Sequence, residues 1–242
     1  MDLTERQIQI LKAIIDEYIE TAGPVGSETL DKKYNLGVSP ATIRNEMVRL
    51  TTSGYLKQPF TSAGRVPTPV GLKYYVNNLM KAKELSVADE VSVKEKVWDY
   101  RNETDRLLRE TVRALAEKTK TLSMAATDEG DMYWSGVGNI LEMPEFFDID
   151  ITKNLLSTLD EYSYWWNIFE RVGVTEDALH IIIGEELDKK PLLPCGLVFI
   201  NFNSPRHKGV LCVIGPSRLD YPYVIPVVRY FGGLVTEMVN SW

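Results

Sequence analysis

SPATIRNEMVRLTTSGYLKQPFTSAGRVPT, residues 39–68, is the stretch that decides the fold of the N-terminal part of the chain. Ser39 is a preferred helix N-cap, and Pro40 suits the first turn, where an N–H has no intrahelical partner. Gly54 marks the end of this helix. The segments YLKQPF and RVPT, on either side of the turn segment TSAG, then indicate two strands of a β-hairpin. The stretch therefore predicts a helix followed directly by a hairpin.

Two further helices are predicted upstream. Thr4 and Gln7 form a capping-box signal, and apolar residues then recur at helical spacing as far as the TAGPVG segment. These residues are Ile8, Leu11, Ile15, Tyr18 and Ile19. Ser27 is expected to cap a short second helix, with Leu30 and Tyr34 on its inner side. The glycine-containing turn NLGV joins it to the helix at 39, which makes a helix-turn-helix with the hairpin as a wing. A further helix is predicted after the hairpin, in the segment PVGLKYYVNNLMKAK.

The third helix has two different sides. Ile43, Met47 and Leu50 fall on one stripe, which is expected to face the core. The opposite side carries Ala41, Asn45, Val48 and Arg49, with Thr42 and Arg44 on its flanks. Asn and Arg pair bidentately with base edges, and the N-terminal residues of this helix reach the bases in a helix-turn-helix. A solvated amphipathic face is the alternative for the helix alone; with the wing attached, we favour DNA binding.

The wing tip, TSAGR, offers small residues, backbone N–H groups and one arginine. Such a tip can approach the phosphates closely or enter the minor groove.

Charge is spread unevenly along the 242 residues, whose net charge is −7. Residues 1–80 and 81–127 each carry +1, whereas residues 128–242 carry −9. Within residues 38–75 there are five bases and one acid, Glu46. Such an asymmetry is expected when one end of a chain meets a polyanion.

Residues 87–122 are charged, contain few helix breakers and are predicted to form a long connecting helix. Apolar residues and one threonine alternate along it by four and three positions, the a/d seam pattern of a coiled coil. The seam consists of Leu108, Val112, Leu115, Thr119 and Leu122. Both a helix packed on its own domain and a helix that pairs with a second copy fit this pattern.

The rest of the chain mixes strands and helices. LSMAAT and MYWSG are predicted as short strands joined by the turn DEGD, and GNILEMPEF as a turn. Residues 152–172 are predicted to be helical, with an aromatic cluster that we interpret as core. ALHIIIGEE, PCGLVFINF and KGVLCVIGP are predicted strands, the last two forming a hairpin around NSPRH, and PYVIPVVRYFGGLVTEMV a closing helix. This order predicts an α+β fold with helices on one side of a sheet.

No catalytic constellation is recognised in the sequence. His180 and His207 have no evident partner carboxylate or nucleophile motif, and the P-loop, H-E-x-x-H and G-x-S-x-G motifs are absent. Arg218 and Asp220 are expected to form a loop ion pair or a helix cap. We therefore expect no enzyme.

The two cysteines and the apolar segments indicate the compartment. Cys195 and Cys212 lie in apolar runs and are expected to be buried thiols, with neither a disulfide nor a metal site. The N-terminus lacks the apolar region of a signal peptide, and the apolar runs are too short to cross a bilayer. A soluble, cytoplasmic protein without a cofactor or metal is expected.

The stretch from LTERQIQILKAIIDEYIETAGPVGSETL to GRVPTPVGLKYYV closely resembles the N-terminal domain of the heat-inducible transcription repressors of bacteria (HrcA type), in a match that spans about residues 3–80. YWSGVGNILEMPEF and VIGPSRLDYPYVIPVVRYFGGLV resemble the closing region of that family, within its GAF-like domain. The resemblance implies an α+β protein with an N-terminal winged helix-turn-helix, a connecting long helix and a C-terminal GAF-like α+β domain. The implied domains are 1–80 (winged helix, DNA-binding), 81–120 (helical linker) and 121–242 (shortened GAF-like domain).

The same resemblance implies a function. Such repressors bind, as homodimers, an inverted-repeat operator upstream of chaperone genes; heat inactivates them, and the chaperonin helps them regain the DNA-binding form. The implied DNA-binding residues are Ser39, Ala41, Thr42, Arg44, Asn45, Arg49, Ser62, Gly64 and Arg65. The alternative is a transcriptional regulator whose GAF-like domain binds a small molecule.

The chain departs from the family at one place. LSMAAT passes through DEGD directly into MYWSG, so the inserted dimerisation domain of the family is expected to be missing. An operator with two half-sites requires two DNA-binding domains that are related by two-fold symmetry. The candidates for the dimer contact are the seam and the surface of the C-terminal domain; we hypothesise that the seam, with Leu108 and Leu115, contributes.

Overall fold

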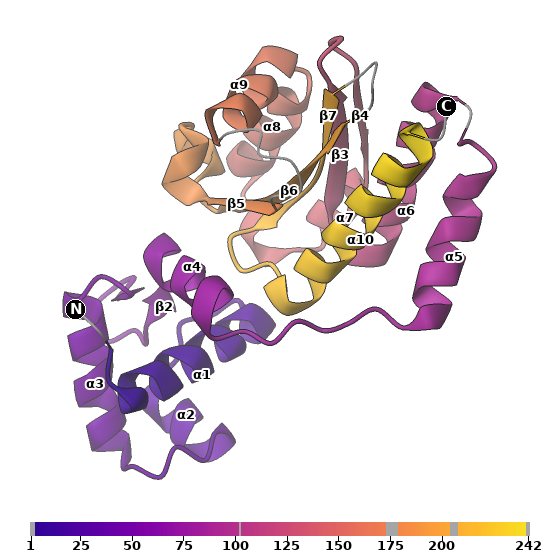
Figure 1. The fold of residues 1–242 in the computed structure, drawn as a ribbon. Helices are drawn as coiled ribbons and strands as arrows, with labels where there is room; N and C mark the ends of the chain where they lie inside the picture. The colour runs from indigo at the N-terminus through magenta and orange to yellow at the C-terminus, as the bar shows by residue number, and fades with distance from the viewer. Residues whose placement is uncertain (1–2, 102, 173–178, 204–207, 241–242) are drawn as a thin grey trace. The chain divides into compact units, whose positions relative to one another are not determined.

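The computed structural model describes residues 3–101, 103–172, 179–203 and 208–240. The chain divides into two compact units, Met1–Lys81 and Ala82–Trp242 (Figure 1).

The first unit combines helices with a small hairpin. Its elements are α1 (Glu5–Thr21), α2 (Ser27–Lys33), α3 (Pro40–Thr52), β1 (Leu56–Lys57), β2 (Val66–Pro67) and α4 (Pro69–Asn78). The capping box of Thr4 and Gln7 at the start of α1 is confirmed, as is the Ser39 cap of α3. The predicted cap of α2 is wrong: Gly26 is the N-cap residue, and Ser27 lies inside the helix with its side chain buried.

The core of the first unit is built from the inner faces of its helices. Ile43, Met47 and Leu50 of α3 are all buried, as the periodicity predicts. The face predicted for α1 was incomplete, because Ile10 and Ile14 are fully buried too. The sequence pattern therefore located the face of α3 better than that of α1, which is covered on more than one side.

The second unit contains the remaining elements. They are α5 (Val87–Trp98), α6 (Thr104–Thr119), β3 (Leu122–Thr127), β4 (Met132–Ser135), α7 (Val137–Ile140), η1 (Pro144–Phe146), α8 (Ile149–Leu159), α9 (Tyr162–Val172), β5 (Leu179–Ile183), η2 (Gly184–Leu187), η3 (Lys190–Leu192), β6 (Cys195–Asn203), β7 (Lys208–Pro216) and α10 (Tyr221–Val239). The helix predicted over 152–172 is in fact two helices, α8 and α9, and the turn predicted for GNILEMPEF holds α7 and η1.

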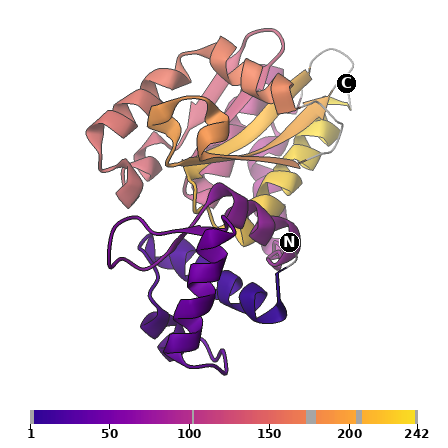
Figure 2. The ribbon, with the colours of Figure 1, turned by 90° about the vertical axis from the view of Figure 1, so that its left-hand side faces the viewer.

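The sheet of the second unit has the strand order β4-β3-β7-β6-β5, and every neighbouring pair is antiparallel. The predicted pairing of β6 with β7 is confirmed, while residues 204–207 of its turn lie outside the described residues. The prediction of helices on one side is wrong: α6 and α10 cover one face, and α8 and α9 cover the other (Figures 1 and 2). The physical reason is that β6 and β7 carry apolar side chains on both faces, so both faces need a cover, and β3 between β4 and β7 is buried on both sides as well.

The aromatic cluster of α9 belongs to the core, as predicted. Trp165 and Phe169 are buried against the sheet, where Phe169 lies 5.1 Å from Phe199 of β6 between ring centroids. Trp165 donates its indole N–H to the carbonyl of Thr158 at 2.8 Å, which satisfies its one polar atom.

α10 is a continuous helix although Pro226 lies in its interior. A proline cannot donate to the carbonyl four residues earlier, which here is that of Pro222. That carbonyl instead accepts the N–H of Lys83 at 2.8 Å. The segment leading into α5 thus satisfies the group that Pro226 leaves open.

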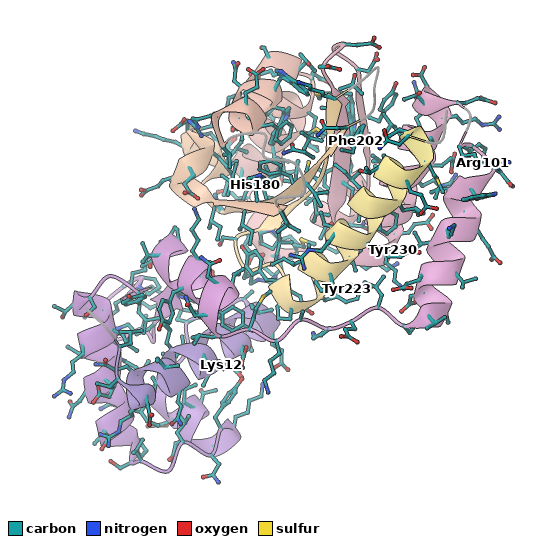
Figure 3. All side chains as sticks on the ribbon, in the orientation of Figure 1. Lys12, Arg101, His180, Phe202, Tyr223 and Tyr230 are labelled. Carbon is teal, nitrogen blue, oxygen red and sulfur yellow. The ribbon has the colours of Figure 1, made fainter. Side chains whose placement is uncertain are left out.

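The long helix predicted over 87–122 is two helices, α5 and α6, which pack together, and Leu122 already belongs to β3. The seam is buried within its own unit: Leu108 and Leu115 are 0% exposed, and Val112 is 1% exposed. α5 is tied to α10 as well, since the Tyr230 hydroxyl donates to the carbonyl of Glu90 at 2.8 Å (Figure 3). The hypothesis that the seam contributes a dimer contact is therefore wrong, because the sheet and α10 already cover it.

None of the described helices has both the length and the apolar character that crossing a bilayer requires.

Candidate nucleic-acid interface

α3 presents one continuous exposed side. Ala41, Arg44, Asn45, Val48 and Arg49 are all exposed on it, opposite the buried stripe. Asn45 and Arg44 make no hydrogen bond or ion pair with any described residue, so their polar groups are available to a ligand. Ser39 and Thr42 are occupied differently: the Ser39 hydroxyl accepts the Thr42 N–H at 3.3 Å and lies 3.0 Å from the Thr42 hydroxyl.

Arg49 is held by a buried acid that the sequence pattern did not place. Glu46 is 5% exposed and accepts hydrogen bonds from Arg49 at 3.0 Å and from Gln7 of α1 at 3.1 Å. A buried carboxylate needs such partners, because an unpaired charge in the interior is costly. The side chain of Arg49 is still 68% exposed. Arg49 thus stabilises the joint between α1 and α3 and can meet a ligand only with its remaining donors.

The hairpin is fixed to the loop before α2. The N–H of Val25 donates to the carbonyl of Arg65, and the N–H of Arg65 to that of Val25, both at 2.9 Å. Gly64 precedes this bridge, and a Cβ on it would lie 2.3 Å from the carbonyl oxygen of Val25. Only glycine permits so close an approach. Gly64 is therefore required by packing, whereas Ser62 is exposed at the tip with φ of 69°.

Arg65 fastens the hairpin to α3. Its Nε donates to the Thr51 hydroxyl at 3.0 Å, and one terminal nitrogen lies 3.3 Å and 3.4 Å from the carbonyls of Ala63 and Gly64. No hydrogen bond within the described chain occupies its other terminal nitrogen. The residue is thus half-buried and positions the hairpin, with part of its guanidinium left open.

A groove of about 430 Å³ runs between α3 and the hairpin. It brings together four of the nine predicted residues, namely Arg44, Ser62, Gly64 and Arg65. The other five are not among its lining residues and belong to α3 or its cap. The groove is also lined by Met47, Val48, Gln58, Ala63, Gly26 and Ser27. Val48 and Gln58 were not predicted; the signal for Val48 was an apolar residue on the free side of the helix.

Cys195, Cys212 and His180 lie in or against the apolar core of the second unit. Burial raises the pKa of Cys195 to about 12 and also raises that of Cys212, so both stay protonated thiols, as predicted. Burial lowers the pKa of His180, which stacks on Phe199 at 4.9 Å, while His207 lies outside the described residues. Among the described residues, no group of three or more His, Cys, Asp or Glu side chains is placed to hold a metal ion.

The ion pair predicted between Arg218 and Asp220 is not formed. Arg218 binds Glu145 through two nitrogens, at 2.5 Å and 3.1 Å, and Asp220 pairs with Lys83 at 2.8 Å. Asp220 does occupy the N-cap position of α10, although its side chain makes no capping bond. Both residues tie the ends of α10 and β7 to distant segments, so their roles are structural.

Residues 69–225 match the family model described as the HrcA protein C-terminal domain. The chain belongs to the HrcA family. The heat-inducible transcription repressor HrcA of Clostridioides difficile is 28% identical, in an alignment that covers 98% of this chain and all of that protein. That of Acetivibrio thermocellus is 35% identical over 90% of this chain and 60% of its own length. A crystal structure described as a hypothetical protein has the same fold, with a TM-score of 0.79, 17% identity and 99% of each chain covered.

The HrcA alignment also bears on chain length. The alignment with the C. difficile repressor extends over 338 residues, more than the 242 residues of this chain. That HrcA protein therefore contains residues with no counterpart here, as expected for a chain that lacks an insert.

Proposed function

We propose that the first unit is a winged helix-turn-helix that reads double-stranded DNA with α3 in the major groove. The observation that carries the proposal is the exposed side of α3, where Arg44 and Asn45 have no partner among the described residues, next to a groove bounded by the hairpin. An α-helix fits the major groove, and Asn and Arg distinguish bases there by paired hydrogen bonds.

The proposed interface assigns different roles to the nine predicted residues. Asn45 and Arg44 contact base edges, and Ala41 permits close approach of the helix. Ser39 and Thr42 face the phosphates at the helix N-terminus, where N–H groups and the helix dipole favour anions. Arg49 and Arg65 combine a contact to phosphate with the structural bonds described above. Ser62 and Gly64 bring the wing to the backbone, with Gly64 acting mainly through its packing on Val25.

For the whole chain we propose a heat-inducible transcription repressor that binds an inverted-repeat operator of chaperone genes as a homodimer in the cytoplasm. Membership of the family and the names of the relatives support this. The second unit is proposed to be a shortened GAF-like regulatory domain, on which the chaperonin acts as a partner. The proposal assigns no cofactor, metal or catalytic step to this chain.

Footprinting of the purified full chain on genomic DNA from its source tests this function. The expected result is protection of a few sites, each with two symmetric halves, upstream of chaperone genes. Uniform weak protection at all sequences would contradict sequence-specific repression. The matched control is the Asn45→Ala chain, which should lose the specific sites and retain weak binding elsewhere.

A second function, sensing of a small polar molecule, is favoured by one observation in the second unit. Asn201 of β6 is 5% exposed, yet neither atom of its amide has a hydrogen-bond partner, and the Nε2 of His180 on β5 is buried without one as well. Buried polar atoms are normally paired, often with water or a ligand. A thermal-shift screen with metabolites tests it: a reproducible shift that Asn201→Leu removes would support sensing, and no shift with any compound would oppose it.

A further inference from the structure

β4 leaves one edge of the sheet unpaired. It pairs with β3 through four residue pairs, from Ser123 with Ser135 to Ala126 with Met132. No second strand pairs with it in the described part of the chain, and no backbone hydrogen bond from its other edge is found there. An open edge is a template for another strand, and proteins usually protect it by keeping the strand very short, or with proline, lysine or a covering segment. The strand MYWS is short, with four residues, but it carries neither proline nor lysine.

The exposed side chain on this edge is large and apolar. Trp134 is 42% exposed. When a tryptophan is buried in an interface, it contributes more binding free energy than most other residues. Tyr133, in contrast, is buried against α6, where its hydroxyl donates to Asp105 at 2.9 Å. The two residues point to opposite faces of the sheet, as neighbours on a strand must.

The charge on this edge changes along its length. At the β3–β4 turn, a hollow of about 410 Å³ is lined by the carboxylates Glu103, Asp105, Glu129 and Asp131. A second hollow, of about 320 Å³, runs along the whole of β4 from Met132 to Ser135 and is also lined by Arg109, Glu110 and Arg113 of α6. Arg109 lies over the Tyr133 ring at 4.8 Å, near the middle of the strand. The edge is therefore acidic at the β3–β4 turn, and it is net basic beyond the turn, where Arg109 and Arg113 follow the strand.

We propose that a second copy of this chain binds along β4, edge to edge and antiparallel, about a two-fold axis. In an isologous contact each end of the surface meets the opposite end of the copy. Two copies of a uniformly charged edge would repel each other. In this pairing the acidic end of each copy lies against the basic part of the other, so the attraction occurs at two symmetric places. The unpaired N–H and C=O groups of the two strands then pair with one another, and the Trp134 side chains lie close to the axis.

The geometry of the pairing limits its register. A two-fold axis perpendicular to the sheet keeps each face on the same side, so residues that lie directly opposite must belong to the same face. Either Trp134 then lies opposite its counterpart, or Tyr133 does; pairing of Tyr133 with Trp134 is excluded. The α6 helices of the two copies then lie on the same face of the joined sheet and run antiparallel to each other. Arg113 of each copy is therefore directed toward the acidic end of the other copy.

This contact supplies the two-fold symmetry that the proposed function requires, and in that respect it rests on the proposed function. It is also an alternative to the seam of α6 as the dimer contact, because the seam is buried within its own unit. The oligomeric state is measured without DNA, so failure of the DNA-binding proposal would leave the result unchanged.

The test is a charge swap in the full chain, followed by sedimentation equilibrium over a concentration series. Arg113 is 66% exposed, with a weak ion pair to Glu117 at 3.5 Å, and Asp131 is exposed, so both positions tolerate substitution. The wild type should be a dimer of two 27.5-kDa chains. Arg113→Glu or Asp131→Arg alone should raise the dimer Kd at least about tenfold, since each places like charges together at two symmetric points.

The double variant, Arg113→Glu with Asp131→Arg, should restore much of the dimer, because it reverses the Arg113–Asp131 attraction at both symmetric points and leaves the other charges unchanged. Trp134→Ser should weaken the dimer without affecting charge. The matched control is Arg229→Glu, the same charge change on the exposed side of α10, which should leave Kd unchanged, with circular dichroism reporting the fold of every variant. A monomeric wild type, single variants that dimerise normally, or a double variant no better than the singles would each overturn the proposal.

Discussion

Substitution of Gly64 by alanine tests whether the hairpin is held against the body of the first unit. The added Cβ would lie 2.3 Å from the oxygen, 2.5 Å from the carbon and 2.9 Å from the nitrogen of Val25. All three are backbone atoms, so no side-chain rotation relieves the clash. The hairpin must move away, and the two hydrogen bonds between Val25 and Arg65 must lengthen. Overpacking costs about 1–3 kcal/mol and each of the two weakened bonds about 0.5–1.5 kcal/mol, so the local loss is about 2–6 kcal/mol.

Hydrogen exchange at the amides of Val25 and Arg65 measures this loss directly. A cost of about 2 kcal/mol or more corresponds to exchange that is faster by roughly thirtyfold or more, because about 1.4 kcal/mol is tenfold. Gly26→Ser is the control, since a Cβ there meets nothing within 4 Å and serine is a good N-cap for α2. Unchanged protection at both amides in Gly64→Ala would refute the assignment of Gly64 to packing.

Three further substitutions or conditions have defined outcomes. Asn45→Ala should cost about 1–3 kcal/mol of binding free energy on the operator and little on random DNA, measured by fluorescence anisotropy; equal losses on both would remove Asn45 from base readout. Arg65→Ala should weaken operator and random DNA alike and reduce the salt slope by about one, and an unchanged slope would leave Arg65 with its positioning role alone. The hydrogen bond from Lys118 holds the pKa of Asp89 below its usual value, so the link between α5 and α6 should be stable above the usual Asp pKa of about 4 and weaken as the pH falls through the lower folded value. Exchange of the α5 amides against pH measures that change, and Lys118→Met, which removes the partner, should abolish it.

The sequence predicted those features that depend on local pattern. Ile43, Met47 and Leu50 fall on one stripe because helical periodicity alone determines which side of α3 is apolar. The Ser39 cap and the β6–β7 hairpin follow equally from neighbouring residues.

What the sequence could not predict depends on segments far apart in the chain. In the sequence, Glu46 was only the single acid within a basic segment. Its hydrogen-bond partner Gln7 lies 39 residues earlier, and only the packing of α1 on α3 brings the two side chains together. The sequence predicted Arg65 as a DNA contact at the wing tip, on phosphate or in the minor groove, whereas its bond to Thr51 requires the hairpin to fold back on α3. The seam of α6 shows the same limit: a three-four pattern indicates that Leu108 and Leu115 are buried, but not which surface buries them.

The central claim is that α3 lies in the major groove of two half-sites. Directed cleavage tests it with a Val48→Cys chain, which keeps Arg44 and Asn45 and carries a single iron chelate on the exposed side of α3, since Cys195 and Cys212 are buried and remain unlabelled. On a footprinted site, cleavage should be confined to two symmetric positions within the half-sites, and the same chelate on Lys153→Cys in α8 should cut weakly and without pattern. Cleavage from position 48 that is no stronger than cleavage from position 153 would contradict this claim.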